Sequence, residues 1–95
     1  MSAYVIGDIE VTDPAGYEEY RKQVLSVVTK YGGKFIVRGG KVDAREGGWN
    51  PKRIVLVEFP SLAQAQKWYD SEEYRPLIKL RQKASKGRLI IVEGA

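Results

Sequence analysis

The sequence contains no cysteine and no histidine. The absence of cysteine excludes disulfide bonds and thiol nucleophiles, and the absence of histidine excludes imidazole bases. Together they exclude Cys/His metal sites and a Ser-His-Asp triad, so that any metal would have to be held by oxygen atoms. We therefore interpret Ser71 as a helix cap, and we predict no metal and no cofactor.

Long apolar runs are also absent. No stretch of about 18 apolar residues occurs and no charged-then-apolar segment opens the chain, so we expect neither a membrane span nor a signal peptide. The cytoplasm is the expected location. With 95 residues and 43% hydrophobic content, residues 1–95 are expected to form one domain that buries about two thirds of its unfolded surface.

The charge is modest in total and uneven along the chain. The 16 basic and 12 acidic residues leave a formal net charge of +4. Acidic residues gather between Asp8 and Glu19, and basic residues gather between Arg75 and Arg88. We interpret both groups as solvated helix faces, with a charged partner site as the alternative.

The clearest pattern lies between Arg53 and Tyr74. Ile54 to Val57 form an unbroken apolar run, which is typical of a strand covered on both faces. Pro60 ends this strand, and Ser61 with Gln64 has the spacing of a capping box that begins a helix. The apolar residues of this helix share one face: Leu62, Ala65, Trp68 and Tyr69. The helix is therefore predicted to pack on a sheet.

Two strands and a helix precede this segment. The stretch from Ala3 to Val11 is strand-like, and a helix follows, with Asp13 as its N-cap and Gly32-Gly33 as its stop. The next strand runs from Lys34 to Arg38. It is expected to bend at the following glycine pair and to extend more weakly from Lys41 to Arg45.

A helical segment and a strand follow. Pro76 is expected to begin a helix that ends at Gly87, and Leu89 to Val92 form a last apolar strand. The order is therefore β-α-β-β-α-β, a ferredoxin-like α+β fold with an antiparallel four-stranded sheet and its helices on one face. Because the third and fourth strands are apolar on both faces, we predict a homodimer whose sheets pack face to face. Trp49, in the loop before Arg53, should fold back on its own hairpin or meet another chain.

Three segments carry a resemblance to a known family: Tyr31 to Gly40 (YGGKFIVRGG), Arg53 to Tyr74 (RIVLVEFPSLAQAQKWYDSEEY) and Val92 to Gly94 (VEG). Over nearly the whole chain, the sequence resembles the small-protein family called domain of unknown function thirteen-thirty. The resemblance implies a dimeric α+β barrel, the architecture of small cofactor-free monooxygenases and muconolactone-type isomerases. It implies no established reaction. The loop AREGGWNPK, around Glu46, departs from the family's shorter and more acidic turn.

Three charged residues stand in or at the end of apolar strands and are our candidate catalytic residues: Asp8, Arg38 and Glu58. Arg38 and Glu58 match the RGG and EFPS motifs of the resembled family. A carboxylate in an apolar cleft can serve as a general acid or base, and an arginine beside it can orient a carboxylate or an enolate oxygen. The alternative is a buried structural ion pair.

A second group contains the candidate ligand-binding residues: Tyr17, Trp68, Tyr69, Tyr74 and Arg81. Trp68 and Tyr74 are expected to line a pocket between helix and sheet, of the mostly apolar kind that holds small ligands. The alternative is that these aromatic side chains, like Tyr20, belong to the core.

Three functions remain open. The leading hypothesis is a pocket for a small aromatic or enolisable molecule, in an enzyme that needs no cofactor or in a binding protein. The second is a non-catalytic dimer whose charged residues are structural. An RNA-binding module ranks last, and we predict no nucleic-acid partner, because the central strands offer Val, Leu, Ile and Glu where RNA-recognition motifs use aromatic residues.

Overall fold

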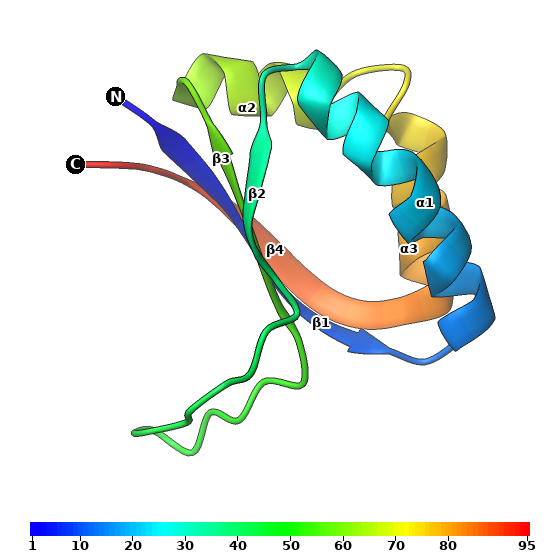
Figure 1. Cartoon of the computed structure of the whole chain (residues 1–95), viewed down its shortest axis with the longest axis vertical. Coiled ribbons are helices and arrows are strands. Elements are labelled where there is room, and N and C mark those ends of the chain that lie inside the picture. The colour runs from blue at the N-terminus through cyan, green and yellow to red at the C-terminus, as the bar shows by residue number, and fades with distance from the viewer.

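Four strands and three helices make up the computed structural model, which describes all residues from Met1 to Ala95. The elements follow in the order β1 (Ala3–Val11), α1 (Pro14–Lys30), β2 (Lys34–Arg38), β3 (Ile54–Phe59), α2 (Leu62–Tyr69), α3 (Arg75–Ala84) and β4 (Ser85–Glu93). The strands are antiparallel and lie in the order β2-β3-β1-β4. All three helices lie on one side of this sheet (Figure 1). The predicted ferredoxin-like α+β fold is confirmed.

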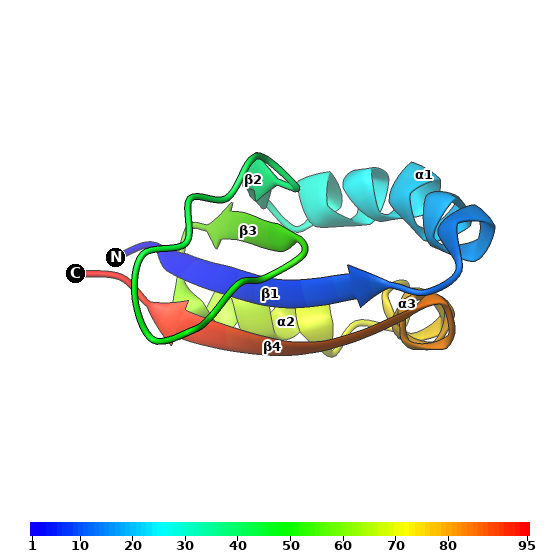
Figure 2. The same ribbon diagram turned by 90° about the horizontal axis from the view of Figure 1, so that it is seen from below.

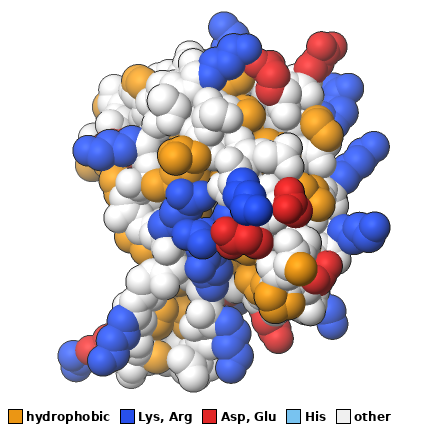
Figure 3. Space-filling view, turned by 45° about the vertical axis from the view of Figure 1, so that its right-hand side comes forward, with side chains coloured by type: hydrophobic (Ala, Val, Ile, Leu, Met, Phe, Trp, Pro, Cys, Tyr) orange, Lys and Arg blue, Asp and Glu red, His pale blue; other side chains and the backbone are white.

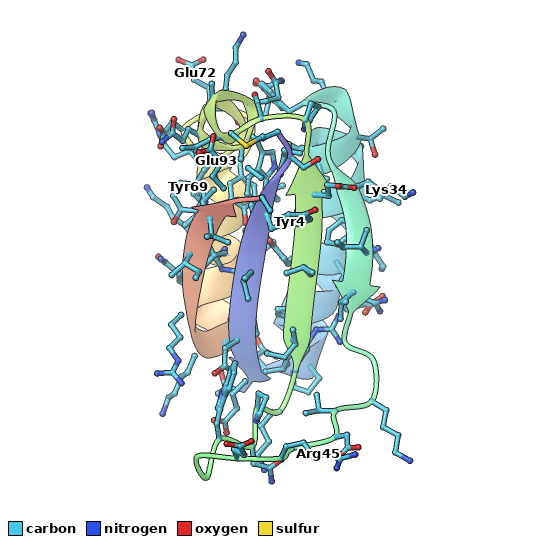
Figure 4. All side chains as sticks on the ribbon, turned by 90° about the vertical axis from the view of Figure 1, so that its left-hand side faces the viewer. Tyr4, Lys34, Arg45, Tyr69, Glu72 and Glu93 are labelled. Atoms are coloured by element: carbon cyan, nitrogen blue, oxygen red, sulfur yellow. The ribbon has the colours of Figure 1, made fainter.

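Strand β1 is one of the two central strands, and its side chains point alternately to the two faces of the sheet. Val5 and Ile9 are buried under the helices, while Tyr4 and Ile6 point to the other side. The pairing Val5↔Val57 continues the buried face into β3. The sheet thus has one face in the core and one face that no helix covers, which is turned toward the viewer in Figure 4.

Side-chain caps begin the first two helices, as the sequence predicts. The carboxylate of Asp13 accepts a hydrogen bond from the Gly16 amide (3.2 Å), and the Ser61 hydroxyl accepts one from the Gln64 amide (3.1 Å). The capping box is only half formed, because the Gln64 side chain donates to the carbonyl oxygen of Tyr31 at 2.8 Å. This hydrogen bond joins the start of α2 to the end of α1.

The predicted boundary between α3 and β4 is wrong. Helix α3 ends at Ala84, before Gly87, and Ser85 is already extended with φ −154° and ψ 164°. The Ser85 hydroxyl donates to the Arg81 carbonyl oxygen (2.6 Å) and so satisfies an acceptor of the last helical turn. Gly87 lies inside β4, where a Cβ atom would overlap the carbonyl oxygen of Asp8. Its role is a close approach of two strands.

The second strand also differs from its prediction. Strand β2 ends at Arg38, and the predicted extension from Lys41 to Arg45 is irregular. The bulge lies between Phe35 and Val37, earlier than the glycine pair. Gly39 has a φ of +75° and leaves room for the Arg53 guanidinium, which occupies the space of a Cβ atom.

The connection from β2 to β3 runs across one end of the sheet toward β4 (Figures 2 and 4). Trp49 in this loop donates from Nε1 to a carboxylate oxygen of Asp8 at 3.0 Å, so the loop folds back on its own sheet. The side chain remains half exposed, at 52%. The contact is within the chain but with β1, not with the β2–β3 hairpin itself, and a contact with another chain stays a prediction.

The uncovered sheet face carries apolar side chains. Ile90 is 59% exposed and Val92 is 43% exposed, although the sequence predicts a last strand that is covered on both faces. Leu89 and Ile91 point the other way and pack against the core. In the single chain, β4 is therefore covered on one face only. None of the helices is both long and apolar enough to cross a membrane.

Candidate functional site

A cavity lies between α1 and the helix-facing side of the sheet. Of its 16 lining residues, 11 are hydrophobic, among them Val5, Val24, Val57 and Leu89. The lining comes from all three helices, from all four strands and from the residues directly before α3 and β3. Gly7 of β1 lies on the sheet side of the cavity, and at this position the strand has no side chain to fill the space. The cavity volume, measured as the space open to the centre of a water-sized sphere, is about 40 Å³. The cavity therefore admits more than one water molecule or part of a small organic molecule.

The polar part of the lining is basic. Arg21, Arg38, Arg53 and Arg81 all line the cavity, and none of the lining residues is acidic. Arg21 is exposed, Arg38 and Arg53 are half-buried, and Arg81 is buried at 7% exposure. Basic side chains gather near the centre of the face in Figure 3, with acidic side chains beside them. The only ion pair of these arginines joins Arg21 to Glu18, at 3.4 Å on the exposed face of α1.

The bulge in β2 turns Arg38 toward the cavity. In a regular strand, Phe35 and Arg38 would face opposite sides, because they are three residues apart. The extra residue, Ile36, lets Phe35 pair with Val57 and Arg38 pair with Val55, and both partners face the helices. The Arg38 guanidinium then lies 4.3 Å from the centre of the Phe35 ring, within range of a cation–π contact.

Neighbouring positive charges surround Arg38. Its guanidinium donates to the Arg21 carbonyl oxygen at 3.1 Å. Partial burial, and after it the charges of Arg21 and Arg53, lower the pKa of Arg38 below its usual value. The group stays protonated at neutral pH, so that this side of the cavity holds an excess of positive charge.

Two tyrosines and an arginine form a buried hydrogen-bonded chain along the cavity. The hydroxyls of Tyr20 and Tyr74 are 2.7 Å apart, and Arg81 Nη1 donates to the Tyr74 hydroxyl at 2.9 Å. Burial raises the pKa of both tyrosines above the usual value. The two hydroxyls are therefore neutral at neutral pH and serve as hydrogen-bond donors and acceptors rather than as bases.

Trp68 contributes a buried donor without an acceptor. Its ring centre lies 4.1 Å from that of Tyr74, and the side chain is 2% exposed. The indole Nε1–H has no hydrogen-bond partner, and the same is true of the buried Nε of Arg53. Leaving such a group without a partner costs about 1–3 kcal/mol. Both residues line the cavity, where a bound molecule could supply the acceptor.

Of the residues singled out from the sequence, five line this one cavity: Tyr17, Arg38, Trp68, Tyr74 and Arg81. Tyr69 lies outside the lining. Its ring packs edge-on against Trp68 and Tyr74, with centres 6.0 and 5.7 Å away. Tyr69 therefore packs behind Trp68 and Tyr74, on the side of these rings that is turned away from the cavity lining.

Asp8 and Glu58 lie on the opposite face of the sheet. Asp8 accepts hydrogen bonds from Trp49 (3.0 Å) and Arg88 (3.3 Å), and Glu58 accepts one from the Tyr4 hydroxyl at 3.3 Å. Neither carboxylate meets Arg38, because the alternation of β1 and β3 directs both of them away from the helices. The structure brings together the arginine and the aromatic residues but not the two carboxylates.

Sequence reasoning missed Arg21, Arg53 and Gly7 as cavity residues. Arg21 stands in the apolar stripe of α1 between Tyr17 and Val24, and a charge inside an apolar stripe is a signal that could have identified it. Gly7, in the middle of an otherwise bulky strand, is the corresponding signal for missing volume. Arg53 precedes β3 and gives no such signal.

Solved structures confirm the architecture. A protein of unknown function from Rhodopseudomonas palustris is similar with a TM-score of 0.75 and 18% identity, over 99% of this chain and 82% of that chain. SnoaB, a cofactor-independent oxygenase from Streptomyces nogalater, is similar with a TM-score of 0.71 and 10% identity, over 99% of this chain and 93% of that chain. At these identities the likeness shows the fold alone.

A dimeric ferredoxin-like protein of unknown function from Thermobifida fusca has a TM-score of 0.58 and 11% identity, over 99% of this chain and 92% of that chain. No curated protein matches the sequence significantly. The model of one protein family, in contrast, matches residues 2–95. This match spans the strands, the helices and the cavity described above, and it confirms the resemblance carried by the RGG, EFPS and WYDSEEY segments: the chain belongs to the family described as domain of unknown function, DUF1330.

Proposed function

We propose that the protein binds a small, largely apolar molecule in the cavity between α1 and the sheet. The observation that carries this proposal is the buried Nε1–H of Trp68, which lines the cavity and has no acceptor. Apolar walls with a few oriented polar groups are the usual lining of a small-molecule site. The small cavity favours a molecule of about one ring or a short chain.

The indole N–H signal of Trp68 in an NMR spectrum tests this proposal directly. Titration with benzamide, butyramide and their parent acids should shift that signal, while the Trp49 signal, identified with Trp49→Phe, stays in place. In Gly7→Val the shift should disappear, because the new side chain fills the floor of the cavity. An added Cβ at Gly7 makes only ordinary contacts, 3.5 Å from Ile9 and 3.9 Å from Val55, so the variant should fold. Absence of any shift in the wild type would refute binding in this cavity.

Catalysis is a second candidate function. The neighbour SnoaB is a cofactor-independent oxygenase, and the cluster of arginines in this chain would stabilise the oxygen of an enolate. However, no carboxylate or histidine lines the cavity, and the buried tyrosines are poor bases. The geometry therefore favours binding over proton abstraction by the protein.

Deuterium exchange separates these two functions. An enzyme acting on enolisable molecules should accelerate the exchange of the acidic C–H protons of acetylacetone in heavy water, and Arg38→Gln should remove most of that acceleration. Equal exchange rates with and without protein would leave binding as the function.

We further propose that the protein is a homodimer in which two uncovered sheet faces pack together. The exposed apolar side chains of Ile90 and Val92 support this arrangement. The neighbour from Thermobifida fusca is a dimeric ferredoxin-like protein. The cavity lies on the helix side of the sheet, away from the face that would pack against the second copy.

A further inference from the structure

We infer that the ligand of this cavity is an anion, and that its carboxylate lies among the guanidiniums of Arg21, Arg38 and Arg53 while its apolar part enters the cavity. This inference rests on the binding function proposed above and specifies the class of molecule. It is carried by the charge balance of the lining, by buried donors without acceptors and by the absence of a carboxylate partner for Arg38, Arg53 and Arg81.

The charges of the cavity lining are unbalanced. Four arginines and no carboxylate line one small cavity, although the whole chain has 12 acidic residues available. Asp8 of β1 and Glu58 of β3, two acidic residues of strands that line the cavity, face away from it. Like charges placed together repel, and partly buried charges are screened less than exposed ones. A negatively charged ligand would remove this repulsion.

Three arginines of the lining, Arg38, Arg53 and Arg81, are buried or half-buried and have no carboxylate partner. Arg81 is 7% exposed and has the Tyr74 hydroxyl as a partner but no carboxylate. Buried charges in proteins are normally paired. No ion pair in the structure involves Arg38, Arg53 or Arg81. The crowding of Arg21 and Arg53 around Arg38 also lowers the pKa of Arg38, after the larger effect of its burial.

The hydrogen-bond donors of the lining suit a carboxylate in their geometry. A guanidinium presents paired N–H groups that match the two oxygens of a carboxylate. The Nε of Arg53 and the Nε1–H of Trp68, both buried without a hydrogen-bond partner, are further donors in the lining. Inorganic phosphate alone would leave the apolar walls empty, so that a carboxylate on an apolar body fits the whole site best.

Two matched pairs of probes test the charge of the ligand. Benzoate is compared with benzamide, and butyrate with butyramide, using the Trp68 indole N–H shift to obtain dissociation constants. Each acid should bind at least tenfold more tightly than its amide. The preference should fall to about one in the double variant Arg38→Gln/Arg53→Gln and should weaken with added salt. Arg45→Gln is the control, because Arg45 lies in the β2–β3 loop, pairs with Asp43 and has an 81% exposed side chain.

The outcomes distinguish this inference from the proposed function. Tighter binding of the acids that depends on Arg38 and Arg53 supports both. Equal binding of acid and amide overturns the anion inference and leaves the binding function intact. Absence of binding by all four probes overturns both. Binding of inorganic phosphate as tight as that of benzoate, with the same Trp68 shift, would also overturn the inference, since the apolar part would then contribute nothing.

Discussion

Arg38 lies next to Arg21 and Arg53, and of these three arginines only Arg21 has a carboxylate partner, Glu18 on the exposed face of α1. The position of Arg38 depends on one extra residue in β2, and its chemistry depends on residues that are distant in the sequence. Tyr20 and Tyr74 are likewise distant in the sequence, 54 positions apart, and their hydroxyls form a hydrogen bond. At the scale of single residues, the site is a set of donors held in an apolar environment.

The buried tyrosines should make the folded state less stable at alkaline pH. Burial raises the pKa of Tyr20, so that the folded state keeps a proton that the unfolded state loses above about pH 10. The free energy of unfolding should therefore be unaffected by this group below about pH 10 and should fall as the pH rises further, by at most about 1.4 kcal/mol per pH unit for each such group.

The variant Tyr20→Phe should be less stable at neutral pH by about 0.5–1.5 kcal/mol, because the hydrogen bond to Tyr74 is lost. Its deficit should narrow above about pH 10, where the wild type begins to lose stability. Urea unfolding at a series of pH values measures both effects. Parallel pH profiles of the two proteins would contradict the prediction.

At the scale of elements, three local devices position the cavity. The cap at Asp13 fixes where α1 begins, the hydrogen bond from Gln64 joins α2 to the end of α1, and the bulge at Ile36 turns Arg38 inward. The turn between α1 and β2 also matters, because Gly33 lies directly against the core. Because Gly33 has no side chain, the chain can pass from the end of α1 into β2 within a few residues.

The variant Gly33→Ala should be destabilised by about 1–3 kcal/mol, the usual cost of overpacking. An added Cβ would lie 2.7 Å from Phe59 and from Val28, and both side chains are buried. Gly40→Ala is the matched control, because no atom lies within 4 Å of its added Cβ. Chemical denaturation of the two variants measures the difference. Equal stability would mean that the turn yields more easily than the packing indicates.

At the scale of the whole molecule, the two faces of the sheet have different roles. The helix-facing side holds the core and the cavity, and the other side exposes Ile90 and Val92 in the single chain. Two copies that pack these faces together would bury the exposed apolar side chains. Dimer formation and ligand binding would then use opposite sides of one sheet.

The variant Ile90→Glu should weaken the dimer by at least about tenfold, because a carboxylate without a partner in the interface costs more than about 1.4 kcal/mol. Leu25→Glu is the matched control. Leu25 is 49% exposed, lies on α1 and is outside the uncovered sheet face. Size-exclusion chromatography with light scattering measures the molar mass of each protein. A monomeric wild type, or a dimer unaffected by Ile90→Glu, would contradict the proposed interface.

Much of the fold follows from local patterns. The bounds of β1, the N-caps Asp13 and Ser61 and the end of α1 agree with the sequence predictions, since each depends on neighbouring residues alone. The boundary at Gly87 was wrong because the same residue can end a helix or let two strands approach, and only the pairing of β4 with β1 distinguishes the two. Five cavity residues were also identifiable as polar or aromatic groups in apolar patterns.

The sequence by itself determined the order of the elements, the absence of thiol and imidazole chemistry, and the polar and aromatic residues from which a site could be built. Only the tertiary structure decided that Arg38 lines the same cavity as Arg53 and Arg81, while Asp8 and Glu58 face away from that cavity. The physical reason is that strand side chains alternate with a period of two, so that one bulged residue reverses the face of all that follow. Register is set by pairing between distant segments, and no local pattern contains it.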